Sequence, residues 1–317
     1  MITCLTDYIG LRNVSDDSEA PTSGIYVNDL PGISSQHFSD IVNDELDGIS
    51  AEWDKIEERS IRAFETDLRS RLKKYFTGYQ LISSGITGYV DDNTQANHGS
   101  GVYSGWLFDM YTFSPSLKVE INDVRVNLVS AQNFNVKIFD ANTGLELYTK
   151  AVVGVQGAQT IKINQSFAVY QHNKIFVCYD TVSPYRVYQN PTFGAISAGS
   201  ISTSSTVLSD NLSSAETGLE VTYNIKCSIE EFVCHRLENF QEAYLYRIGL
   251  EFLKNSKYSD KINRWTLLDI ETTNQLIEEF KMEYENLLES SLMDLKVPDD
   301  GICFICNKAI SEKVLIP

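Results

Sequence analysis

The sequence lacks a long apolar segment and is poor in basic residues, and both deficits exclude classes of protein. Of its 317 residues, 26 are Lys or Arg and 43 are Asp or Glu, which gives a formal net charge of −17. This surplus of negative charge repels phosphate backbones, so we do not expect nucleic acid as the principal ligand. No run of about 18 apolar residues occurs, so no membrane-spanning helix is expected. The first residues lack the basic and apolar regions of a signal peptide, and none is expected.

Recognisable catalytic motifs are also missing. The four histidines are far apart in the sequence, and none has a partner at the spacing of a zinc-binding helix. No Gly-x-Ser-x-Gly motif occurs, and the glycine-rich residues 99–105 lack the lysine of a phosphate-binding loop. We therefore expect no catalytic residues, no cofactor and no enzymatic activity. A hydrolase whose carboxylate pair is not revealed by spacing is the alternative within the enzyme class.

The cysteines offer one compact motif. Without a secretory signal, we expect reduced thiols. Cys303 and Cys306 form a CxxC pair, which is a candidate for metal binding. A structural zinc site usually needs two such pairs, and the nearest second pair is Cys234-His235 on a predicted helix. Reduced structural thiols are therefore the favoured interpretation, with zinc as the alternative.

Apolar residues are abundant and their spacing predicts secondary structure. The chain is 43% hydrophobic, with 17 Tyr and 15 Phe, which is enough for a substantial core, and its length suggests two domains. Between residues 36 and 76, apolar positions recur every three or four residues. This spacing predicts an amphipathic helix, or two helices broken near Gly48. Basic residues such as Arg71 gather near its C-terminal end, where the helix dipole favours cations.

Helical spacing returns in the last third of the chain. Apolar stripes run from Ile229 to Phe252 and from about Asp269 to Leu295, which predicts a helical hairpin. Ser228 and Glu231 match a capping box at the start of the first of these helices, because the two side chains can cap each other's backbone amides.

The middle of the chain has the period of β-strands. Val124 and Val126 alternate with Arg125, and similar alternation recurs between residues 79 and 227 with turn residues between the runs. Residues 91–94 are expected to form a polar turn, and residues 194–214 a long loop or an edge hairpin. Several antiparallel strands at this spacing predict a β-sandwich or jelly roll.

Together these patterns predict an α+β fold in which N- and C-terminal helices form one bundle and an antiparallel, jelly-roll-like β-sandwich is inserted between them. The predicted parts are an extended N-terminal arm (1–34), a helical segment (35–77), a β-sandwich (78–227), a helical hairpin (228–297) and a C-terminal tail with the CxxC pair (298–317).

Residues 23–34 combine turn residues with apolar side chains ahead of the first helix. Pro31 restricts its own φ and Gly32 can adopt the positive φ of a type II turn, so a tight turn is predicted. The apolar side chains need a surface to cover them, and we expect that surface to belong to an identical neighbouring copy. The segment is therefore predicted to be a docking arm with the interface residues Ile25, Tyr26, Val27, Leu30, Pro31 and Ile33.

The residues Asp7-Tyr8-Ile9-Gly10-Leu11, together with the stretch from Ser23 to Ser34, resemble a structural protein family of tailed phages that infect Bacteroidota. More specifically, the chain resembles ring proteins of the portal–neck–tail stack in crAss-like phages. The resemblance extends to the helix that begins near Phe38 and to the closing CxxC segment.

This resemblance implies a virion component that is assembled in the cytoplasm of the host bacterium. It implies a homo-oligomeric, dodecameric ring that contacts portal, ring or tail proteins, with no membrane and no specific nucleic acid as partner. It provides no catalytic residues.

An aromatic cluster motivates a second interpretation of function. The residues involved follow a predicted strand: Tyr179, Tyr185, Tyr188, Pro191 and Phe193. Aromatic side chains at the rim of a sandwich can stack on sugars, so a carbohydrate-binding or adhesion module on a virion or cell surface is the alternative function. Core packing and a protein interface are the other two roles that these residues can have.

Overall fold

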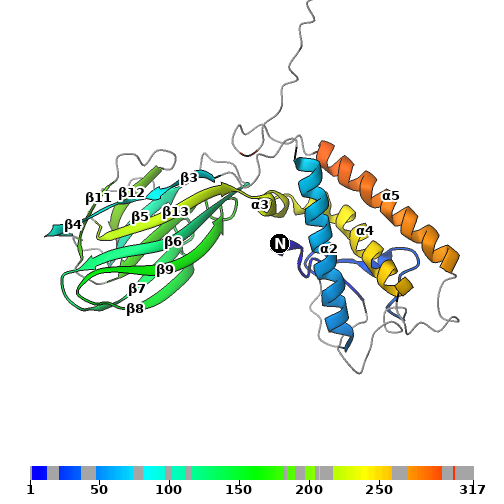
Figure 1. Cartoon of the computed structure of the whole chain (residues 1–317), viewed down its shortest axis with the longest axis horizontal. Coiled ribbons are helices and arrows are strands. Elements are labelled where there is room, and N and C mark those ends of the chain that lie inside the picture. The colour runs from blue at the N-terminus through cyan, green and yellow to red at the C-terminus, as the bar shows by residue number, and fades with distance from the viewer. Residues whose placement is uncertain are drawn as a thin grey trace, which may run out of the picture. The chain divides into compact units, whose positions relative to one another are not determined.

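The computed structural model has an α+β fold, as the sequence predicts, and it divides into two compact units (Figure 1). The helical unit comprises Met1–Thr77 and Phe232–Pro317, and the sandwich unit comprises Gly78–Glu231. None of the described helices is long and apolar enough to cross a membrane. The structure describes residues 2–12, 21–36, 48–73, 81–96, 102–110, 116–180, 184–189, 197–203, 207, 217–258, 270–294 and 303.

The described residues 2–12 and 21–34 form the N-terminal segment of the helical unit. Its elements are η1 (Thr3–Leu5), β1 (Ile9–Gly10), β2 (Ile25–Tyr26) and η2 (Val27–Asp29), and β1 pairs in parallel with β2. The predicted tight turn is present: the N–H of Ile33 donates to the carbonyl of Leu30 at 3.4 Å, and Gly32 has a φ of 78°. This φ lies in the left-handed region that glycine adopts without strain.

Four further helices lie within the described residues of the helical unit and at its boundary. They are α2 (Gly48–Leu72), α3 (Ile229–Cys234), α4 (Leu237–Tyr258) and α5 (Ile270–Asp294). The predicted helices are confirmed where the structure describes them. Residues 37–47 lie outside the described residues, so the predicted break near Gly48 stays a prediction. The single stripe expected from Ile229 to Phe252 is instead interrupted by a turn at residues 235–236.

Helix α4 is the centre of the helical unit and packs against both α2 and α5 (Figure 1). Its side chains are buried on most of its circumference, as expected for a helix with neighbours on several sides. The ring of Phe64 from α2 is fully buried and lies 6.1 Å from that of Phe240, 5.6 Å from that of Tyr244 and 6.4 Å from that of Tyr284. These rings join α2, α4 and α5 into one core.

The sandwich unit has two main antiparallel sheets. One has the strand order β12-β5-β10-β7-β8 and the other β3-β13-β6-β9, while β11 and β4 form a separate pair. The strands are β3 (Leu81–Ile86), β4 (Gly88–Gln95), β5 (Tyr103–Asp109), β6 (Leu117–Leu128), β7 (Asn133–Asp140), β8 (Glu146–Val153), β9 (Gly157–Ala168), β10 (Lys174–Asp180), β11 (Tyr185–Gln189), β12 (Ser197–Thr203) and β13 (Leu219–Cys227).

Alternating side chains explain how the two sheets pack. In β6, Val124 and Val126 are buried and Arg125 is exposed, as their period of two predicts. Two buried side chains then link the sheets through polar atoms. The indole N–H of Trp106 in β5 donates to the carbonyl of Leu219 in β13.

The second link is the phenol oxygen of Tyr179 in β10, which accepts from the backbone N–H of Gly218 at 3.0 Å. Such bonds satisfy the polar ends of large aromatic residues within the core.

Three local expectations change in the structure. Residues 91–94 belong to strand β4 rather than to a turn, because β4 pairs with β11. The stretch 194–214 contains the edge strand β12 within its described part. The capping box is half formed: the N–H of Glu231 donates to Oγ of Ser228 at 3.3 Å, whereas the N–H of Ser228 donates to the carbonyl of Ser116 instead.

Candidate functional site

The apolar residues of the predicted docking arm lie inside the chain's own fold. Val27, Leu30 and Ile33 are at most 6% exposed. Leu30 lies directly over helix α4, where a Cβ added to Gly249 would come within 2.6 Å of its Cδ1. The expectation that a neighbouring copy covers these three side chains is therefore wrong, because the chain's own helices cover them. The described residues 2–12 and 21–34 are part of the helical unit rather than an extended arm.

Three residues of the predicted interface remain accessible. Ile25 and Tyr26 are half-buried and Pro31 is exposed. The guanidinium of Arg12 lies 4.5 Å from the centroid of the Tyr26 ring and also pairs with Asp29 at 3.1 Å. These contacts hold the outer rim of the N-terminal segment in place, and an interface role for Ile25, Tyr26 and Pro31 stays a prediction.

Most of the described cysteines are disulfide-bonded, whereas reduced thiols were expected. Cys4 and Cys234 form a disulfide with a Cα–Cα distance of 5.7 Å. Cys227 and Cys303 also take part in disulfides, while Cys178 is a buried free thiol. The expectation of reduced thiols is therefore wrong for four cysteines. Of the candidate metal pair, Cys303 has its sulfur in a disulfide and Cys306 lies outside the described residues. The described residues contain no group of three or more His, Cys, Asp or Glu that could hold a metal ion.

The aromatic cluster is only partly described. Tyr179 is 1% exposed and belongs to the core, so this residue cannot stack on a ligand. Tyr185 is half-buried in β11. The side chains of Tyr188, Pro191 and Phe193 lie outside the described residues, and a carbohydrate-binding role stays a prediction without support from Tyr179.

An acidic side chain is buried where the N-terminal segment meets α2. Glu57 is 5% exposed, and its Oε1 accepts a hydrogen bond from the N–H of Asp7 at 2.8 Å. Burial raises the pKa of Glu57 to about 7; the hydrogen bond opposes this shift, and the charges of Asp7 and Asp54 add to it. The buried hydroxyl of Tyr244 has no hydrogen-bond partner in the described part of the chain, and its pKa is raised by burial and then by Glu57 and Asp7.

We expect Glu57 to make the stability of the helical unit depend on pH. The pKa of Glu57 is higher in the folded chain than in the unfolded chain. Its contribution to the free energy of unfolding is therefore full below the unfolded pKa and is lost as the pH rises through about 7. The shift corresponds to about 3 kcal/mol. Urea denaturation of the wild type and of Glu57→Gln, at about pH 5 and about pH 8, measures how much the free energy of unfolding of each changes with pH.

The control for this prediction is Glu58→Gln, because Glu58 is the exposed neighbour on the same helix. This substitution should leave the pH dependence of the wild type unchanged. Equal pH dependence in the wild type and in Glu57→Gln would contradict the assignment to Glu57.

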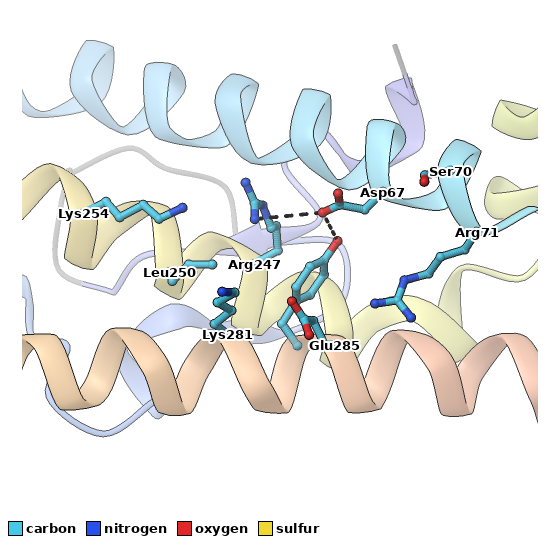
Figure 2. Close-up of a pocket in the computed structure, with 9 residues that line it drawn as sticks. Asp67, Ser70, Arg71, Arg247, Leu250, Lys254, Lys281 and Glu285 are labelled. Atoms are coloured by element: carbon cyan, nitrogen blue, oxygen red, sulfur yellow. Dashed lines mark hydrogen bonds and ion pairs between the residues drawn. The ribbon is translucent and has the colours of Figure 1, made fainter.

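The three long helices line an open cavity of about 510 Å³ (Figure 2). Its size is in the range of small-molecule sites. The lining residues come in threes from the helices α2, α4 and α5: Asp67, Ser70 and Arg71; Arg247, Leu250 and Lys254; and Lys281, Tyr284 and Glu285. Basic side chains outnumber acidic ones by four to two in this lining, although the chain as a whole is strongly acidic.

Carboxylates pair with three of the four cations in this lining: Glu289 with Arg71, and Glu251 with Arg247 and Lys254. Asp67 accepts a hydrogen bond from the hydroxyl of Tyr284 at 2.8 Å and lies 4.0 Å from Nη1 of Arg247. Burial, followed by the hydrogen bond and charge of Asp67, raises the pKa of Tyr284, so this hydroxyl keeps its proton. Lys281 has no ion-pair partner in the part of the chain that the structure describes.

Little in the amino-acid sequence indicates this cavity. Arg71 was interpreted as a cation that favours the end of its helix, and the other basic residues lie on helices that are far away in the sequence. Composition gives no signal either, because Lys281 is the one basic residue of α5 among seven acidic ones. Helical period alone does not bring these residues together.

Comparison with known proteins gives no family for this chain. No protein-family model matches the sequence, and no curated protein matches it. Among solved structures, a chain of the IBDV viral particle has a TM-score of 0.20 and 12% identity over 68% of this chain. A mutant VP2 protein of infectious bursal disease virus has a TM-score of 0.18 and 12% identity over 56% of this chain. This chain covers about half of each, 54% and 52%, and similarities of this size carry no argument about its role.

Proposed function

We propose that this chain is a non-enzymatic structural protein of a tailed-phage virion. Identical copies form a ring, with dodecameric symmetry to match a portal, in the portal–neck–tail assembly. The ring contacts portal, ring or tail proteins, and it assembles in the cytoplasm of the host bacterium before it becomes part of the virion. A closed ring requires two different, complementary surfaces on each copy.

The observation that carries this proposal is the N-terminal motif, whose residues resemble those of ring proteins in crAss-like phages. The motif forms a defined element in which Gly32 has a positive φ and the apolar residues pack into the helical unit. These residue types therefore have a structural reason to stand at this spacing. The exposed rim of the same element, at Tyr26 and Pro31, is the surface that we assign to the neighbouring copy.

The oligomeric state of the purified chain tests the proposal. We expect native mass spectrometry to detect a closed ring, alone or with the portal protein. The double variant Tyr26→Ala, Pro31→Asp should lose the ring and keep its circular dichroism spectrum, because neither side chain is in the core. Val153→Asp, at a 76% exposed position of the sandwich unit, is the matched control. A chain that stays monomeric with and without the portal protein, and is missing from purified virions, would contradict the proposal.

A further inference from the structure

We propose that the cavity between α2, α4 and α5 binds a small ligand through a phosphate-type oxyanion. The site is independent of the ring, because the helical unit of one chain provides all of its lining. Arg71, Arg247 and Lys281 come from three different helices and line the same pocket, spread along it with Arg247 turned toward Asp67 (Figure 2). Several cations along one pocket favour an anion with several negative oxygens.

Arg247 is the fixed part of this site. Its side chain is 13% exposed, its Nη2 donates to Glu251 at 2.7 Å, and its guanidinium lies 5.5 Å from the centroid of the Tyr284 ring. Its Nε is buried and has no hydrogen-bond partner among the described residues. A buried guanidinium with an unused donor costs free energy unless a ligand or water accepts from it. The planar donor set of arginine is suited to phosphate oxygens.

Arg71 and Lys281 are the adjustable part. Arg71 lies 3.6 Å from Glu289, a carboxylate that is itself 61% exposed, and such a pair stabilises little. Lys281 is exposed and has no ion-pair partner in the described part of the chain. Both side chains can therefore turn to a ligand without breaking a strong contact. Lys254 is less free, because it pairs with Glu251 at 3.2 Å.

The carboxylates of the cavity decide which anion fits. Asp67 accepts a hydrogen bond from Tyr284 and lies near Arg247, so its negative charge is largely compensated. Glu285 also lines the cavity and has no ion-pair partner among the described residues. It therefore repels an anion, and its removal should strengthen binding. Tighter binding after removal of Glu285, and weaker binding after removal of a cation, would distinguish an anion site from a cluster that only holds the helices together.

The cavity is also larger than one oxyanion needs, and Leu250 and the ring of Tyr284 supply apolar contacts. The ligand that fits is thus a small organic phosphate or a polyphosphate, whose charged part contacts the cations that line the pocket.

Isothermal titration calorimetry of the full chain with inorganic pyrophosphate at low salt tests the site. We expect one saturable site per chain. Arg71→Ala and Lys281→Ala should each weaken binding by about tenfold or more, because a charge-assisted hydrogen bond is lost. Glu285→Gln should tighten binding by roughly threefold, because a nearby like charge is removed. Arg62→Ala, an exposed cation on α2 outside the cavity, should bind like the wild type.

The ligands are distinguished by parallel titrations with inorganic phosphate and a nucleoside diphosphate. Tighter binding of the nucleoside diphosphate than of pyrophosphate would show that the apolar part of the cavity is also used, and equal binding would assign recognition to the oxyanion alone. Either result supports the site. No saturable binding of any of the three, or binding that Arg71→Ala and Lys281→Ala leave unchanged, would overturn the proposal.

Discussion

Replacing Cys4 and Cys234 together with alanine is expected to lower the free energy of unfolding of the helical unit by about 5 kcal/mol. The disulfide joins residues that are 230 positions apart, so it removes a large amount of chain entropy from the unfolded state. The sandwich unit lies inside this loop, and its strands β3 and β13 pair directly. If it stays folded, the effective loop shortens to about 80 residues, which changes the expected cost by only about 1 kcal/mol.

Variants isolate this bond better than a reductant does, because Cys227 and Cys303 are disulfide-bonded as well. Both Cys4 and Cys234 are only half-buried, so their truncation to alanine removes little packing. Urea denaturation followed by helical circular dichroism measures the effect. Cys178→Ala, which removes the free thiol of the sandwich unit, is the control for a cysteine substitution without a crosslink. A double variant that unfolds at the same urea concentration as the wild type would contradict the loop-closure argument.

The secondary structure could be predicted from the sequence because it depends on local spacing. The stripe that contains Phe280, Tyr284 and Leu288 identifies α5, and all three side chains are buried as expected. The period of two around Val124 likewise identifies β6. The residues of each pattern lie within about ten positions of one another in the sequence. The packing of one face of a helix or strand on the core is therefore enough to produce the pattern.

The partner of the N-terminal segment could not be predicted in the same way. Val27, Leu30 and Ile33 were correctly expected to be buried, but their burial against α4 depends on contacts between residues more than 200 positions apart. One signal was present. Gly249 stands within a strong helical stripe, where it costs about 1 kcal/mol relative to alanine, and such a glycine indicates close approach of another segment. That segment is the one that carries Leu30.

The pairing of the cysteines and the position of the cavity could not be predicted for a related reason. The pairing of several cysteines cannot be deduced from their positions in the sequence alone. The cavity needs Arg71, Arg247 and Lys281 to meet across three helices. Each of them stands where an ordinary solvated cation can stand, so only the packed structure reveals their common site.

Phe64→Ala is expected to destabilise the helical unit by about 3 to 5 kcal/mol. The side chain is fully buried on α2 and contacts rings from both α4 and α5. Its removal leaves a cavity at the one place where the three long helices meet, and it also removes edge-to-face ring contacts worth about 0.5 to 1.5 kcal/mol each. The neighbouring aromatic rings are rigid, so the structure has little scope to close the cavity.

Phe108→Ala provides the matched control for Phe64→Ala, because Phe108 is equally buried in the sandwich unit and its ring lies 5.5 Å from that of Tyr223. Urea denaturation followed separately by helical and by strand-specific spectroscopic signals compares the two variants. Phe64→Ala should shift the helical transition more than the strand transition, and Phe108→Ala should do the reverse. The reason is that each core is built from the side chains of its own unit. Equal shifts of both transitions in both variants would show that the two units unfold as one, and an unchanged helical transition in Phe64→Ala would contradict the position of Phe64 at the centre of the helical core.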